Sequence, residues 1–170
     1  MEILQHPPSQ AVYQRILKPF PTVAIVGVDS KQAANFFVEV NLLKNKADDG
    51  AEYQYVPLNP AHTGNKKDKN LLEGQLVQRS EQGSEGLVVV FRKLKVLTTS
   101  AQQGALFVLK FSLKRYVDNI LEPVPGVPPI YSTPVEVFSH SSYLKGRPSP
   151  SLKESKSSKH LSKFHKNQTC

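Results

Sequence analysis

Alternating hydrophobic and polar positions are clearest between residues 86 and 116. In the second half of this stretch, apolar side chains recur at every second position, which is the period of a half-buried β-strand. The apolar positions are Phe107, Leu109, Phe111 and Leu113, and the polar positions between them are Lys110, Ser112 and Lys114. The first half has the same period but changes parity at Arg92-Lys93, so we expect a bulge or a bend there. Together the two runs predict a long β-hairpin with its polar tip at residues 98–104.

Similar patterns divide the rest of the chain into short strands separated by polar loops. The expected strands are residues 22–28, 36–42, 53–58, 72–79 and 130–138, with residues 1–17 as an edge strand or ordered arm. Pro134 places the last strand at an edge or a bulge. The expected loops are residues 44–52, 61–70, 80–85 and 117–127, and one helical turn is expected near residues 31–34.

Seven or eight strands without a convincing helix are typical of an all-β protein. We therefore expect an immunoglobulin-like antiparallel β-sandwich. The chain has no Trp and only one Cys, which excludes the disulfide-bonded antibody type of this sandwich. A small closed β-barrel is the alternative architecture.

Composition indicates one folded domain followed by a tail. The 170 residues carry a net charge of +8, and residues 146–170 contain six basic residues against Glu154, a balance of +5. Residues 1–145 therefore hold only +3, and we expect them to form the β-sandwich domain. We expect the Ser/Lys-rich segment 146–170 to be a disordered basic tail, because it lacks the apolar groups to offset chain entropy. Neither a signal peptide nor an 18-residue apolar run is evident, so we expect an intracellular protein that does not bind membranes.

The sequence offers few residues for catalysis. Its nine glycines are scattered without the spacing of a phosphate-binding loop, and no GxSxG motif is present. The histidines do not form a pair of the metal-site kind, and the single Cys170 excludes a cysteine-based zinc site. We therefore expect a protein that is not an enzyme and that holds no cofactor or metal.

The order of features from Gly86 onward is distinctive: an FRKLKVL strand, a TTSAQQG turn, an ALFVLKFSLKRY strand, a proline-containing crossover and PIYSTPVEVFSHSSYLKGRPSP. This order resembles the carboxyl half of the immunoglobulin-like DNA-binding domains of the Rel, Runt, CSL and STAT transcription factors. The positions that carry the resemblance are Phe91, Leu94, Ser100, Gly104, Phe107 and Leu109, with the basic exit at Lys145 and Arg147. Residues 3–28 are similar in outline to the start of Rel domains.

The resemblance implies a nuclear transcription factor that binds double-stranded DNA in a sequence-specific manner, as a homodimer or with a partner transcription factor. Arg15 and Arg147 are the candidates for base contacts, because a guanidinium fork matches guanine. Lys18, Lys93, Lys95 and Lys145 are candidates for phosphate contacts. The candidates for hydrogen bonds to the DNA backbone are Ser139, His140 and Ser141 after the last strand and Ser100, Gln102 and Gln103 at the hairpin tip.

A second hypothesis follows from the modest +3 charge of residues 1–145. The sandwich would then be a protein-interaction domain, of the adaptor or scaffold type, that captures a peptide through its loops or an exposed strand edge without binding DNA.

Overall fold

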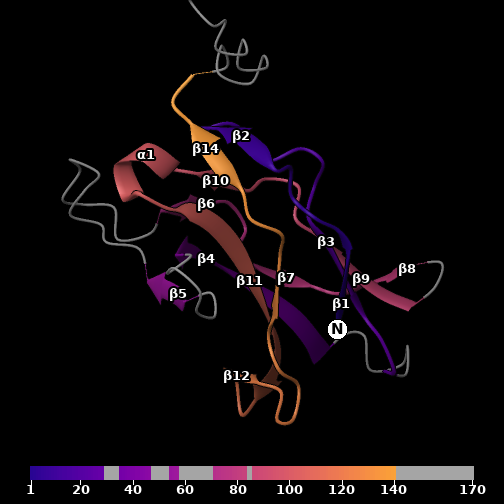
Figure 1. Cartoon of the computed structure of the whole chain (residues 1–170). Coiled ribbons are helices and arrows are strands. Elements are labelled where there is room, and N and C mark those ends of the chain that lie inside the picture. The colour runs from indigo at the N-terminus through magenta and orange to yellow at the C-terminus, as the bar shows by residue number, and fades with distance from the viewer. Residues whose placement is uncertain (29–34, 47–53, 58–70, 84–85, 141–170) are drawn as a thin grey trace, which may run out of the picture.

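A computed structural model describes residues 1–28, 35–46, 54–57, 71–83 and 86–140 (Figure 1). These residues fold as a β-sandwich with one short helix among them. Its strands are β1 (Glu2–Gln5), β2 (Gln10–Val12), β3 (Thr22–Ile25), β4 (Phe36–Lys46), β5 (Gln54–Pro57), β6 (Leu72–Glu73), β7 (Val77–Arg79), β8 (Glu81–Gly83), β9 (Gly86–Val90), β10 (Lys95–Val96), β11 (Leu106–Val117), β12 (Ile120–Pro123), β13 (Ile130–Tyr131) and β14 (Glu136–Phe138). The helix α1 spans Ser100–Gln103.

Two antiparallel sheets form the layers of the sandwich. The first has the strand order β1-β3-β9-β8, and the second has the order β12-β11-β4-β5, with β7 also pairing with β4 and β13 with β11. Two small pairs complete the fold, the antiparallel β6–β10 and the parallel β2–β14. The predicted all-β sandwich class is therefore confirmed. The segment 146–170 lies outside the described residues.

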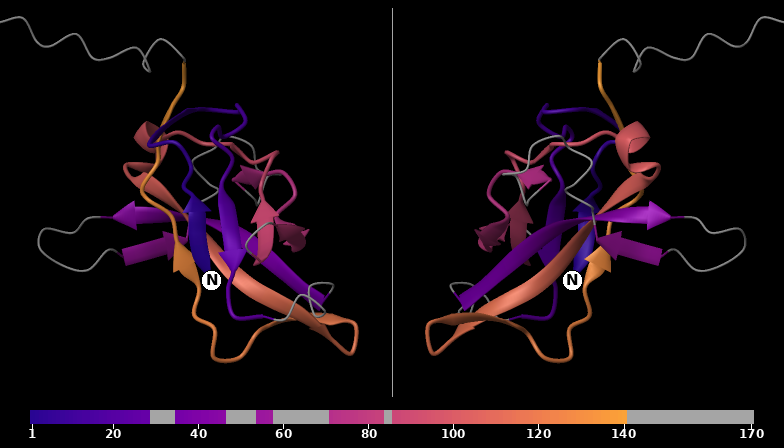
Figure 2. Two further views of the ribbon diagram at one scale, coloured as in Figure 1. Left: turned by 90° about the vertical axis from the view of Figure 1, so that its right-hand side faces the viewer. Right: turned by 90° about the vertical axis from the view of Figure 1, so that its left-hand side faces the viewer.

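The longest pairing joins β4 to β11, which lie side by side in both views of Figure 2. The inward positions of β11 that alternation predicted, Phe107, Leu109, Phe111 and Leu113, are all at most 4% exposed. On β4, Val38 and Val40 are fully buried. Because both strands turn one complete apolar face to the core, the period-2 pattern was sufficient to assign them.

The predicted hairpin over residues 86–116 is wrong, because its two runs lie in different sheets. β9 pairs with β3 and β8, whereas β11 pairs with β4, β12 and β13. The chain leaves the first sheet through the turn at Arg92-Lys93, so the bend predicted from the change of parity is confirmed. Alternation reports which face of a strand is buried but not which strand is its partner, and this is why the hairpin was mistaken.

The TTSAQQG segment is a capped helical turn rather than a hairpin tip. Thr99 is the N-cap of α1, its side chain accepts from the Gln102 N–H at 3.2 Å, and Gln102 Oε1 accepts from the Thr99 N–H at 3.0 Å. Gly104 ends the turn in the left-handed conformation at φ 62°. A Thr followed three positions later by Gln is the sequence signature of this capping box.

Three predicted loops contain strand residues. β4 continues through Lys46 into the predicted loop 44–52, and β8 lies inside the predicted loop 80–85. β12 forms within the predicted crossover 117–127, because Asp118 and Asn119 adopt φ values of 51° and 66° and close a tight turn from β11. The predicted last strand is divided into β13 and β14 around Pro134. The predicted helical turn near residues 31–34 and the predicted loop 61–70 fall outside the described residues.

Candidate nucleic-acid interface

One end of the sandwich joins the beginning of the chain to the end of its described part. β2 runs parallel to β14, with Gln10 opposite Glu136 and Val12 opposite Phe138. The Tyr13 N–H continues this pairing by donating to the Phe138 carbonyl at 2.8 Å. Figure 1 shows β2, β14 and α1 together at this end, where the described chain finishes, and β12 at the opposite end. We refer to the end formed by β2, β14 and α1 as the exit end.

A tight turn over residues 12–15 presents Arg15 at the exit end. The Arg15 N–H donates to the Val12 carbonyl at 3.0 Å, and Gln14 adopts φ 57°. The Gln14 N–H donates to the Val96 carbonyl at 3.0 Å, which fixes the turn against β10. Because its backbone is held in this way, the exposed Arg15 side chain has a defined starting point.

Arg15 lies beside the residues that follow β14. A surface hollow of about 490 Å³ is lined by Val12, Tyr13, Gln14, Arg15, Ser139 and His140. The structure therefore brings together three of the candidates, Arg15, Ser139 and His140. In the sequence, Arg15 is more than 120 positions away from the other two. Only the tertiary pairing of β2 with β14 makes them neighbours.

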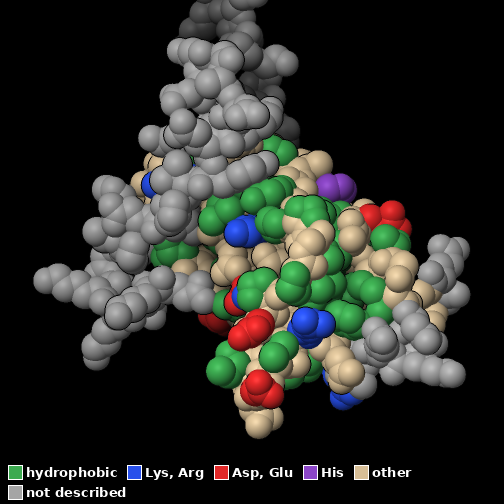
Figure 3. Space-filling model, turned by 90° about the horizontal axis from the view of Figure 1, so that it is seen from below, with side chains coloured by type: hydrophobic (Ala, Val, Ile, Leu, Met, Phe, Trp, Pro, Cys, Tyr) green, Lys and Arg blue, Asp and Glu red, His purple; other side chains and the backbone are tan. Residues whose placement is uncertain are grey.

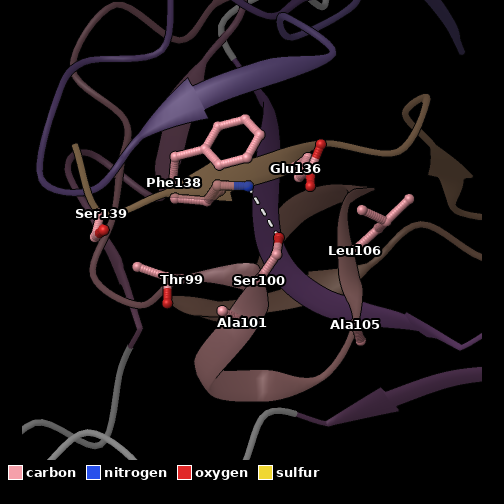
Figure 4. Close-up of a pocket in the computed structure, with 9 residues that line it drawn as sticks. Thr99, Ser100, Ala101, Ala105, Leu106, Glu136, Phe138 and Ser139 are labelled. Carbon is pink, nitrogen blue, oxygen red and sulfur yellow. Dashed lines mark hydrogen bonds between the residues drawn. The ribbon is translucent and has the colours of Figure 1, made fainter. Parts of the chain in front are cut away.

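The three residues of α1 that were predicted to contact the DNA backbone already form hydrogen bonds within the protein. The Ser100 hydroxyl accepts from the buried Val137 N–H at 2.9 Å, which is the dashed line in Figure 4. Gln103 is 6% exposed, and its amide donates to the Thr98 hydroxyl at 3.2 Å, so its side chain is not available to a ligand on the surface. Gln102 is exposed, but its side-chain oxygen accepts from the Thr99 N–H in the capping box.

A second hollow, of about 590 Å³, is lined by residues of both α1 and β14 (Figure 4). Its lining includes Ala101, Ala105, Leu106 and Phe138, with Glu136 as its charged residue. An apolar hollow with a carboxylate at its rim does not favour a phosphate group. Of the two hollows described at the exit end, the one beside Arg15 is therefore the one lined by a permanently cationic side chain.

From Arg15 the chain runs antiparallel to the segment that connects β9 with β10. Ile16 forms a bridge with Lys95, the Leu17 N–H donates to the Leu94 carbonyl at 2.9 Å, and the Phe91 N–H donates to the Pro21 carbonyl at 2.9 Å. Leu17, Phe91 and Leu94 are at most 1% exposed and anchor this ribbon to the core. We refer to residues 15–21 together with residues 91–96 as the flank ribbon.

Basic side chains of the flank ribbon differ in their partners. Lys95 donates to Glu73 at 2.7 Å, so its charge is already balanced. Lys18 and Lys93 are exposed. The Lys18 Nζ lies 5.8 Å and the Arg92 Cζ 6.0 Å from the centroid of the Phe20 ring, which places the two cations near one aromatic side chain.

Arg92 was not among the candidates from the sequence. The sequence feature that indicates Arg92 is the change of parity of the apolar positions at Arg92-Lys93. A turn at that point, between two buried positions, must expose the residues at its centre. Ser141, Lys145 and Arg147 lie outside the described residues, and their predicted roles stay predictions.

Within the ranges that the structure describes, no group of three or more His, Cys, Asp or Glu side chains could hold a metal ion. In the same part of the chain, no helix has the length and apolar character of a membrane span. A comparison of the sequence with models of known protein families finds no match, and a comparison with curated proteins finds no significant relative. The resemblance to the Rel, Runt, CSL and STAT superfamily therefore stays a prediction.

Proposed function

We propose that this protein is a nuclear transcription factor whose β-sandwich binds double-stranded DNA in a sequence-specific manner through the exit end. The observation that supports this proposal is the position of Arg15. It stands on a fixed turn next to Ser139 and His140, at the point from which the chain continues into a segment with a balance of +5 over residues 146–170. The proposal thus combines a specific contact by Arg15 with a general electrostatic attraction by the basic segment that follows in the sequence.

The chemistry of these residues fits two kinds of DNA contact. An arginine fork can donate two parallel hydrogen bonds to guanine in the major groove, and it cannot lose its charge at neutral pH. The short side chains of Ser139 and His140 suit hydrogen bonds to phosphate oxygens, which set the register of a protein on the duplex. The lysines of the tail would add attraction without sequence preference.

Fluorescence anisotropy with a library-selected duplex and a random duplex tests the proposal, using full-length protein and the variants Arg15→Gln and Arg115→Gln. Arg115 is an exposed cation of β11 in the second sheet, so its variant is matched in charge. We expect Arg15→Gln to weaken binding to the selected duplex by about tenfold, since a bidentate base contact is worth about 1–3 kcal/mol. If Arg15→Gln and Arg115→Gln bound each duplex with the same affinity, the assignment of Arg15 to a base contact would be contradicted.

A protein-interaction domain is the second candidate, and the end opposite the exit end favours it. Figure 3, seen from below, shows hydrophobic side chains gathered on that face. Tyr116 and Ile120, on either side of the β11–β12 turn, are 56% and 62% exposed. Apolar groups concentrated on a surface are typical of protein-binding sites. Partners lost by Ile120→Asp but retained after nuclease treatment at high salt would support this second function.

A further inference from the structure

A pocket of about 220 Å³ lies where the flank ribbon meets β7 and β8. Its polar lining consists of Gln75, Gln78, Arg79, Glu81, Arg92 and Lys93. We refer to it as the flank pocket. Three of these side chains are cationic and one is anionic, so the pocket carries an excess of positive charge.

No ion pair within the described part of the chain accounts for the grouping of the cations in the flank pocket. Arg79, Arg92 and Lys93 are exposed and form no ion pair with any residue that the structure describes. Like charges gathered around one hollow repel each other, and this repulsion is relieved when an anion occupies it. The Gln78 amide already donates to the Gln75 carbonyl at 3.4 Å, so the arginines and the lysine are the principal donors to an anion.

The backbone that carries Arg92 and Lys93 is held on three sides. Phe91 and Leu94, which flank the turn, are fully buried. Gly74 packs directly beneath it, because a Cβ atom at Gly74 would lie 2.6 Å from the Lys93 carbonyl oxygen. The two cations therefore extend from a fixed turn rather than from a free loop, and a fixed turn lowers the entropy cost of binding.

The flank ribbon connects this pocket with Arg15. The ribbon spans four positions from Lys95, opposite Ile16, to Phe91, beside Pro21. Four residues extend over at most about 13 Å. Each strand of B-DNA advances 3.4 Å per phosphate, so this distance corresponds to about four nucleotides. Lys18, exposed and close to the same Phe20 ring as Arg92, lies on the ribbon between the two sites.

We propose that the flank pocket binds backbone phosphates of the same DNA duplex that Arg15 contacts, so that one strand passes from the exit end over the flank ribbon. This inference rests on the proposed function. A phosphodiester strand fits better than a single phosphorylated side chain, because Lys18 and Arg92 lie near the same Phe20 ring and the flank ribbon continues from there to Arg15.

The salt dependence of duplex binding tests the inference. We would measure the affinity of full-length protein for a mixed-sequence duplex at several salt concentrations, with the double variant Arg92→Gln/Lys93→Gln. The double variant Lys110→Gln/Arg115→Gln removes the same charge from β11 and is the matched control. Loss of two phosphate contacts should lower the slope of log K against log salt by about 1.8, whereas the control should keep the slope of the unmodified protein. Urea unfolding midpoints would verify that both variants fold.

The possible results separate the flank inference from the proposed function. A reduced slope for the flank variant alone supports the flank pocket as a phosphate site. If the unmodified protein binds the duplex but both double variants give the same slope, the flank inference is overturned while the proposal of DNA binding is not. If the unmodified protein binds no duplex, both proposals are overturned.

Discussion

Ser100→Ala distinguishes a structural role of Ser100 from a direct contact with DNA. In the structure, the Ser100 hydroxyl accepts from the Val137 N–H at 2.9 Å and thereby connects α1 to β14. Val137 is 1% exposed, so the alanine variant leaves a buried backbone donor without its partner. Because Ser139 and His140 follow β14 directly, this bond supports the geometry of the candidate interface.

The expected cost follows from burial. A buried donor that loses its partner costs about 1–3 kcal/mol. The hollow of about 590 Å³ beside α1 gives water access to this region, which places the expected loss near the lower limit. We therefore expect a loss of about 1–1.5 kcal/mol in the free energy of unfolding and a fall in the melting temperature of about 3–5 °C. Urea unfolding followed by circular dichroism measures the first quantity, and a thermal scan measures the second.

Ser139→Ala is the matched control, because Ser139 is exposed and follows β14 by one residue. We expect this control to change stability by less than about 0.5 kcal/mol, as surface substitutions usually do. Equal unfolding midpoints for the two alanine variants would refute the reasoning that Ser100 holds β14 in place. Ser100→Thr, which keeps a hydroxyl, should restore part of the lost stability.

Three further predictions concern the backbone and the core. Gly74→Ala should lower the free energy of unfolding by at least about 2 kcal/mol, because Gly74 has φ 134° and a Cβ would meet the Lys93 carbonyl; an unchanged urea midpoint would show that the turn can move. Gln14→Gly should raise the free energy of unfolding by about 0.5 kcal/mol. Glycine removes the strain of the positive φ at this position, and this gain exceeds the cost of the greater conformational freedom that glycine gives the unfolded chain. A loss of stability in the same assay would contradict this. Phe107→Ala should cost about 3–5 kcal/mol, because Phe107 is fully buried, and a loss below 1 kcal/mol would be incompatible with a close-packed core around it.

The half-buried strands were the part of the fold that the sequence could predict. The alternation in residues 107–113 and 36–42 identified the inward faces of β11 and β4 because each face is buried along nearly its whole length. Pairing could not be predicted in the same way, since β9 has a similar alternation but belongs to the other sheet. The sequence analysis did not predict the Asp118-Asn119 turn, because the prolines that follow it led to the prediction of an irregular crossover over residues 117–127.

The candidate site was predictable only one residue at a time. Arg15, Ser139 and His140 were chosen for their chemistry, but their proximity depends on the parallel pairing of β2 with β14, which no local pattern reports. Gln103 was chosen as a polar residue of an expected hairpin tip, and the capped turn of α1 instead buries it. The parity change at Arg92-Lys93 predicts that Arg92 is exposed, but no local pattern shows that its turn lies beside β7.

We have proposed that duplex DNA binds at the exit end. The most direct test is an NMR titration of isotope-labelled full-length protein with a duplex, in which the backbone amide shifts are followed residue by residue. We expect the largest shifts at Gln14, Arg15, Ser139 and His140, with smaller shifts at Arg92 and Lys93. Shifts confined to Tyr116 and Ile120 at the opposite end, or no shifts at saturating duplex, would contradict it.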